Sequence, residues 1–215
     1  MREVAGIRLP DSALCQAATE LAQRVSEPFL FNHVMRSCVY AECLGRQGQR
    51  PYDRELLYVA TILHDLGLTG LAPLRERFEV EGADLAKEFL AREGMSEPAL
   101  ELAWDAIALH TTAGIPLRKQ PVIALSHLGI ACDIRGMADN PELVALREPV
   151  RKAYPWLALQ RTLPEALVGL HRRSPAATSS HAVADACERL VPGFRRFNLC
   201  DILLTSAQGE AAAPV

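Results

Sequence analysis

The chain has 215 residues, of which 49% are hydrophobic and 23% charged, and its formal net charge is -3 at pH 7. This composition is ordinary for a globular protein with a sizeable core, and the slight acidity gives no reason to expect a nucleic-acid partner. No run of about 18 apolar residues is free of charge, and the first residues do not follow the pattern of a signal peptide. We therefore expect a cytoplasmic protein with no membrane partner.

The six cysteines are scattered along the chain, with no Cys-x-x-Cys pair, and most of them lie in apolar helical contexts. They are Cys15, Cys38, Cys43, Cys132, Cys187 and Cys200. Small apolar thiols of this kind are typical of the core of a protein in a reducing compartment. We expect all six to be reduced.

Helical periodicity predominates in the first two thirds of the chain, and no convincing run of alternating β-branched residues indicates a strand. Asp11 and Ser12 are suited to cap a helix over 12–26, and Pro28 is suited to open the next, which is expected to end near residue 47. The next pattern predicts a helix over 54–68 that Gly67 and Gly70 stop. Three more helices are expected over 81–94, 96–114 and 119–137.

The remaining part, 139–208, reads as shorter helices separated by prolines, followed by a frayed tail. No linker is long enough to separate domains. We therefore predict an all-α fold, a single-domain helical bundle that comprises residues 1–215.

Several of these expected helices carry side chains that suit a metal ion. They are His33, the adjacent pair His64-Asp65, His110 and Asp133. Imidazole and carboxylate groups bind zinc, iron, manganese or cobalt, and helical bundles build such sites from several helices. Adjacent residues of a regular helix point about 100° apart, so the pair is expected to share one ion only if the helix loosens before Gly67.

Neighbouring residues extend this hypothesis. Arg36 lies three residues after His33 on the same helical face, where it is expected to orient a ligand carboxylate or to bind an anionic substrate; an interhelix salt bridge is an equal alternative. His127 precedes Asp133 by six residues, about 240° around the helix, and so faces elsewhere. The histidines that we exclude from the set of ligands are His127, His171 and His181.

The ordered pattern His33, His64-Asp65, Asp133 resembles the H…HD…D signature of the HD-domain superfamily of metal-dependent hydrolases, over residues 28–138. The segment "NHVMRS" resembles the family's N-H-x-x-R opening, and "CDIRG" its D-x-x-G close. "RFEVEGADLA" (77–86) is similar to the F-E-x-x-G-A segment of the cyanamide hydratase-like branch. The resemblance implies an α-helical core, about 28–138, in which these four residues bind one divalent metal ion.

Departures from the pattern bear on the substrate. Residues 66–70 contain no acid, whereas nucleotidase-like members have one shortly after the HD pair. The Lys and the G-Y-P element of the cyclic-dinucleotide phosphodiesterases are absent as well. Two-metal members need two further histidines, and here only His110 and the outward-facing His127 lie between the pair and Asp133. The segment "HDLGLT" is closest to the cyanamide hydratases.

We therefore expect hydrolysis or hydration by a metal-bound water whose pKa falls toward ~7. His33, His64 and Asp133 are the firmest expected ligands, and Asp65 is expected to bind the ion or accept a proton from the water. His110 is expected to shuttle protons or orient the substrate.

Hydroxyl and apolar side chains near these residues are expected to contact the substrate. Thr69 and Thr111 are expected to donate hydrogen bonds to the substrate, although such hydroxyls are more often helix caps. A small nitrile such as cyanamide would need a closed pocket. The side chains expected to line it are Leu68, Trp104 and Ile107.

Two alternative functions stay open. An HD-type phosphohydrolase acting on a nucleotide would use the same metal, with Arg36 and the basic region 147–196 engaging phosphate. That region has nine Lys or Arg residues against four Asp or Glu, which also fits a plain solvated face. A non-catalytic, metal-stabilised binding module is the second alternative. The expected partners are a small-molecule substrate and, through apolar helix faces in the last third, a second copy in a homodimer.

Overall fold

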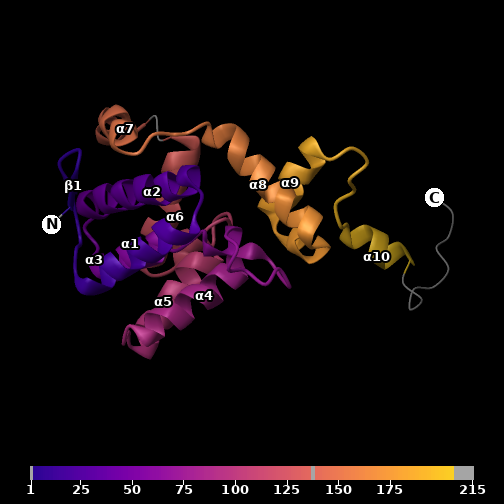
Figure 1. Cartoon of the computed structure of the whole chain (residues 1–215), viewed down its shortest axis with the longest axis horizontal. Helices are drawn as coiled ribbons and strands as arrows, with labels where there is room; N and C mark the ends of the chain where they lie inside the picture. Colours follow the sequence, from indigo (N-terminus) through magenta and orange to yellow (C-terminus); the bar gives the residue numbers. More distant parts are fainter. Residues whose placement is uncertain (1, 137–138, 206–215) are drawn as a thin grey trace.

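The computed structural model describes residues 2–136 and 139–205 and consists almost entirely of helices (Figure 1). The first helices are α1 (Ala13–Val25), α2 (Pro28–Gln47), α3 (Arg54–Ile62), α4 (Phe78–Arg92), α5 (Glu97–Ala108) and α6 (Pro121–Arg135). They are followed by α7 (Pro141–Ala153), α8 (Leu159–Arg173), α9 (His181–Leu190) and α10 (Leu199–Thr205). The short 3-10 segments are η1 (Leu66–Leu68), η2 (Pro116–Arg118) and η3 (Pro175–Ser179). The expected all-α fold is confirmed.

A small hairpin at the N-terminus corrects the expectation that the chain has no strand. Strand β1 (Arg2–Val4) pairs in antiparallel fashion with β2 (Ile7–Leu9). The turn between them is made by Ala5 and Gly6, both with positive φ. Strands of three residues are too short to show an alternating pattern, so the hydrophobic sequence gave no signal.

Helix α2 is the central element of the main core, and it packs closely against α6. The contact depends on Gly129 of α6. A Cβ at this position would lie 2.6 Å from the Cβ of Ala41 and 2.7 Å from the carbonyl oxygen of Ser37, both in α2. This close approach brings the C-terminal half of α6, and with it Asp133, against the face of α2 that carries His33.

Helix α3 ends earlier than expected. The prediction extended it to residue 68, but its last residue is Ile62 and Leu63 closes the final turn. His64 and Asp65 therefore lie in an irregular turn before η1. Helix α5 also ends early, at Ala108, so His110 likewise lies in a turn directly after a helix.

Helices α8 and α9 lie at one side of the bundle, with α10 farther out (Figure 1). They share a second apolar cluster that includes Leu167, Leu170 and Val183, and Phe78 of α4 also belongs to this cluster. The cysteines are all free, as expected, and five of the six are buried. Among the described residues, no helix is both long and apolar enough to cross a membrane.

Candidate metal centre

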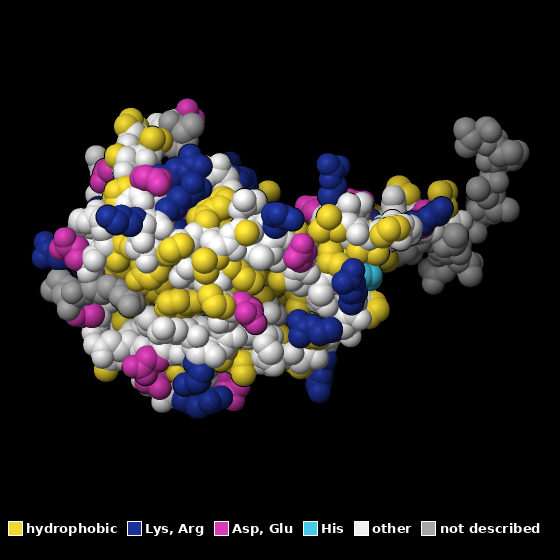
Figure 2. Space-filling view, turned by 45° about the horizontal axis from the view of Figure 1, so that its top comes forward, with side chains coloured by type: hydrophobic (Ala, Val, Ile, Leu, Met, Phe, Trp, Pro, Cys, Tyr) yellow, Lys and Arg dark blue, Asp and Glu magenta, His cyan; other side chains and the backbone are white. Residues whose placement is uncertain are grey.

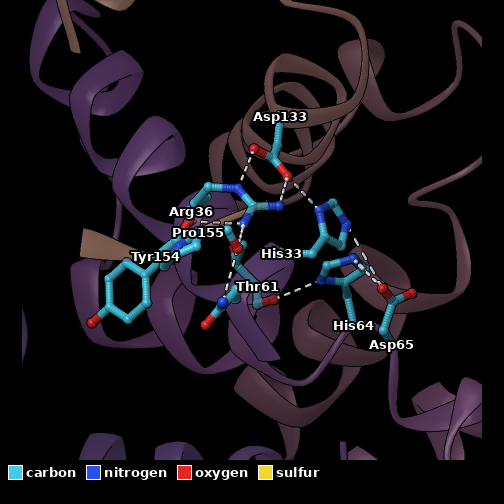
Figure 3. Close-up of polar contacts among 9 residues, drawn as sticks. His33, Arg36, Thr61, His64, Asp65, Asp133, Tyr154 and Pro155 are labelled. Atoms are coloured by element: carbon cyan, nitrogen blue, oxygen red, sulfur yellow. Dashed lines mark hydrogen bonds and ion pairs between the residues drawn. The ribbon is translucent and has the colours of Figure 1, made fainter. Parts of the chain in front are cut away.

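Three side chains from two parts of the chain converge at the buried end of α3. His33 comes from the middle of α2, and His64 and Asp65 come from the turn after α3 (Figure 3). One ligand atom from each lies within 4.8 Å of the others. Asp65 Oδ2 is 3.2 Å from His64 Nε2 and 3.7 Å from His33 Nε2. The turn thus directs the side chains of His64 and Asp65 to the same point, whereas a regular helix would direct them about 100° apart.

The ring orientations of His64 and His110 leave the Nε2 atom of each ring able to act as a ligand. His64 Nδ1 lies 2.8 Å from the Thr61 carbonyl oxygen, to which it donates a hydrogen bond. His110 Nδ1 donates in the same way to the Ile107 carbonyl at 2.6 Å. A ring whose Nδ1 carries the proton has its lone pair on Nε2. Backbone carbonyls in this role commonly orient metal-binding histidines.

A divalent metal ion fits this group of atoms. His64 Nε2 is buried and has no hydrogen-bond partner among the described residues, although it faces Asp65. Leaving a buried polar atom unsatisfied costs about 1–3 kcal/mol, and a cation between His33, His64 and Asp65 would remove that cost. Two imidazoles and a carboxylate suit zinc, iron, manganese and cobalt alike.

Asp133 lies behind His33 rather than within the group. Its Oδ2 accepts a hydrogen bond from His33 Nδ1 at 2.6 Å. Arg36, which is 0% exposed, holds the same carboxylate with two bonds of 2.7 and 2.8 Å (Figure 3). Arg36 therefore contacts a carboxylate that was expected to be a ligand, as one of its proposed roles required. Direct binding of Asp133 to the metal stays a prediction.

The model of the HD domain matches residues 30–143, just over half of the chain. The chain belongs to the HD domain family. A search of curated proteins finds no match. HD membership together with the buried His-His-Asp group indicates a metal-dependent hydrolase, while the cyanamide hydratase-like branch stays a prediction.

The turn that carries the HD pair depends on two glycines. A Cβ on Gly67 would lie 1.8 Å from the carbonyl oxygen of Phe78, at the first turn of α4. A Cβ on Gly82 of α4 would lie 2.9 Å from the backbone nitrogen of Gly67. The F-E-x-x-G-A segment therefore lets α4 press directly against the HD turn. Glu81 secures the loop before α4, because its carboxylate accepts hydrogen bonds from the backbone nitrogens of Leu74 and Glu76.

The electrostatics of the centre keep opposite charges paired. Burial alone would raise the pKa of Asp65, but His64 and His33 outweigh it and hold that pKa below its usual range. Burial would lower the pKa of His64, and Asp65 raises it on balance. Burial and the nearby His64 lower the pKa of His110 to about 4, so His110 is neutral at pH 7. The Asp133 pKa is lowered despite burial, because His33 and Arg36 stabilise the carboxylate.

Glu79 is a buried residue of the centre that the sequence analysis did not identify. Its Oε1 accepts hydrogen bonds from Thr111 at 2.6 Å and Ser180 at 2.7 Å, while Oε2 is buried without a partner. Burial would raise its pKa, but attraction to His110 and the hydrogen bonds from its donors lower it. The only sequence signal was its place in the F-E-x-x-G-A segment, whose Glu was not assigned a role.

A cavity of about 340 Å³ opens onto the metal group. Its walls include His33, His64, Asp65, His110 and Thr111, together with side chains of α6, α8 and α9. Of the expected apolar lining, Leu68 is present, but Trp104 and Ile107 are not among the lining residues, which corrects that expectation. Trp104 instead donates a hydrogen bond to Asp84.

His110 lies close to the metal group, whereas Thr69 and His127 have structural roles. His110 Nε2 lies 3.8 Å from Asp65 Oδ1, close to the metal group. Thr69 is buried, and its hydroxyl donates to the Leu66 carbonyl at 2.6 Å in the manner of a helix cap; it is not among the cavity residues. His127, excluded from the ligands, bonds through Nδ1 to the His110 carbonyl oxygen at 2.8 Å and so secures the His110 turn.

Proposed function

We propose that this HD protein is a metal-dependent hydrolase or hydratase that acts on a small uncharged substrate, and that a nitrile is the best candidate. The observation that carries the proposal is the lining of the metal cavity. Eight of its fifteen lining residues are apolar. They include Leu68 of η1, Phe78 of α4 and Ile130 of α6.

The charges of the cavity favour a neutral substrate over a phosphoester. Arg135 is the only Lys or Arg among the lining residues, and Asp185 brings a negative charge to the same walls. Arg36, which was a candidate for binding phosphate, has its donors engaged by Asp133 and by the carbonyl oxygens of Tyr154 and Pro155. A doubly charged phosphate would therefore find little compensation beyond the metal itself.

The protein's own groups supply the rest of the chemistry. His33, His64 and Asp65 would hold one divalent ion, which lowers the pKa of water toward ~7 and polarises the substrate. Neutral His110 offers its Nε2 lone pair on the cavity side of Asp65, where it accepts a proton or a hydrogen bond. Thr111, whose hydroxyl donates a hydrogen bond to Glu79, would orient the His110 turn, and the apolar lining residues would contact the uncharged part of the substrate.

The test is a substrate screen on the metal-loaded protein. Aliphatic and aromatic nitriles, with cyanamide among them, would be compared with nucleotide monophosphates and with cyclic and other phosphodiesters. The proposal expects turnover of a nitrile to its amide, lost in His64→Ala and kept in His181→Ala, a change at an exposed histidine.

Turnover of phosphoesters alone would replace the proposal with the phosphohydrolase alternative. A metal-loaded protein that turns over neither class would favour a metal-stabilised binding module. Both outcomes contradict the nitrile proposal.

A further inference from the structure

A second cavity, of about 390 Å³, lies between the C-terminal end of α6, α7 and the segment after α7. Three arginines contribute to its walls: Arg135 from α6, and Arg147 and Arg151 from α7. We call it the arginine pocket. Figure 2 shows Lys and Arg side chains gathered in a hollow on this side of the molecule, next to α7.

The three arginines have no acidic partner in the part of the chain that the structure describes. Other basic side chains do: Arg46 and Arg54 share Glu42, and Lys87 pairs with Glu97 and Glu101. The one acid in the walls of the arginine pocket is Asp133, and its two oxygens are already taken by Arg36 and His33. The pocket therefore gathers three positive charges that no described acidic residue neutralises.

The floor and sides of the pocket are partly polar and partly apolar. Tyr40 is only 3% exposed, yet it lines the pocket, and its hydroxyl has no hydrogen bond to any described residue. Arg151 lies over the Trp156 ring, with Cζ 4.2 Å from the ring centroid, and the contact orients that guanidinium. Leu143 and Val144 supply an apolar wall.

We infer that the arginine pocket is a binding site for a small organic phosphate. Guanidinium groups bind phosphate oxygens in pairs, and three of them with a tyrosine hydroxyl match the several oxygens and double charge of a phosphoryl group. The pocket is larger than inorganic phosphate, and its apolar wall would contact an organic substituent. A carboxylate, with two oxygens and one charge, would leave donors unused.

The proposed site is separate from the metal group, although the two cavities share a wall. Ile134 and Arg135 line both, whereas Arg147 and Arg151 line only the arginine pocket. Variants of these α7 arginines therefore test the phosphate site without altering a residue of the metal cavity, and the inference does not depend on the proposed reaction.

The experiment measures binding by titration calorimetry on the metal-loaded protein. The probes are inorganic phosphate and phenylphosphonate, which cannot be hydrolysed like a phosphate ester, with benzoate as the carboxylate of the same ring. We expect phenylphosphonate to bind most tightly and benzoate most weakly. Arg147→Gln and Arg151→Gln should each weaken phosphonate binding about tenfold, the loss expected when one charged hydrogen-bonding partner is removed.

The matched control is Arg161→Gln, which removes the same charge from an exposed position of α8 in a different groove; it should bind phenylphosphonate like the wild type. Equal weakening in Arg161→Gln would show general charge attraction and overturn the inference. Benzoate binding as tight as phenylphosphonate binding would overturn the assignment to phosphate.

A second arm separates this site from the metal. Chelator-treated protein and the His64→Ala variant should still bind phenylphosphonate. If binding vanished on metal removal but survived in Arg147→Gln and Arg151→Gln, the probe would be bound at the metal and the inference would be wrong. Absence of any binding would overturn it as well.

Discussion

The two cavities beside the C-terminal end of α6 differ in how charge is compensated. In the metal centre, each buried carboxylate faces histidine or arginine, and the buried polar atoms without a hydrogen-bond partner among the described residues include His64 Nε2, which is directed at Asp65, and Glu79 Oε2. In the arginine pocket, Arg135, Arg147 and Arg151 are exposed or half-exposed and have no acidic partner among the described residues. Buried ions must be paired, whereas exposed cations are solvated by water and can bind an anion from solution. The first pattern indicates a cation site and the second an anion site.

The largest expected effect comes from disrupting the contact between α4 and the turn that carries His64 and Asp65. Gly67→Ala would place a Cβ on the Phe78 carbonyl oxygen, so α4 and the HD turn would have to separate. We expect the free energy of unfolding to fall by about 4 kcal/mol or more, with loss of metal binding. Urea unfolding and metal analysis would measure both.

Gly70→Ala is the matched control, because a Cβ at Gly70 meets no atom within 4 Å. It should fold and bind metal like the wild type. If Gly67→Ala were as stable as Gly70→Ala, the close approach of α4 would not position the HD pair.

Replacing a paired arginine and replacing an unpaired one should have different effects on the free energy of unfolding. Arg36→Met would leave the buried Asp133 carboxylate without its main partner and should cost about 3–5 kcal/mol of stability. Arg147→Met removes a cation that has no acidic partner in the described part of the chain, and it should change stability by no more than about 0.5 kcal/mol. Thermal or urea unfolding of the two variants gives the comparison directly. Equal effects would mean that the Arg36–Asp133 contact does not stabilise the fold.

Replacing Glu79 should have a smaller effect on the free energy of unfolding, and this effect should depend on pH. Its pKa is lowered in the folded state, so its carboxylate stabilises the fold above the unfolded pKa of about 4.3. That contribution is lost as pH falls through the folded pKa. Glu79→Gln should therefore cost about 1–3 kcal/mol at pH 7 and reduce the loss of stability between neutral and acidic pH.

Urea unfolding from pH 7 down to pH 3 checks this expectation, with Glu165→Gln as a control at an exposed carboxylate of α8. A Glu79→Gln variant whose stability falls with acid as steeply as the wild type would contradict the role assigned to this carboxylate.

The candidate site was predictable from the sequence where its signal is local. The order of His33 and His64-Asp65 is visible without a structure, and so is Gly67, which follows the pair closely. Glu79 was not predictable, because its partners Thr111 and Ser180 lie 32 and 101 residues away. The early end of α3 was missed because the apolar periodicity continues to Leu68, while the tertiary contact of Gly67 with Phe78 determines the turn.

The pairing of Asp133 shows a related limit. Its place in the ordered signature was clear, but its carboxylate is shared by His33 and Arg36 of α2. That arrangement depends on the depth to which α6 packs at Gly129. Pattern and spacing identify which helices supply ligands, but the packing of those helices determines which atoms meet.

We expect His33, His64 and Asp65 to hold a metal ion, and the metal content of the protein tests this expectation most directly. Untagged protein would be analysed by inductively coupled plasma mass spectrometry beside His64→Ala, Asp65→Asn and the control His181→Ala. We expect about one equivalent of a divalent metal in the wild type and in His181→Ala, and close to none in the other two. Wild-type protein without metal, even after reconstitution, would contradict this expectation and leave His64 and Asp65 as a buried, hydrogen-bonded pair.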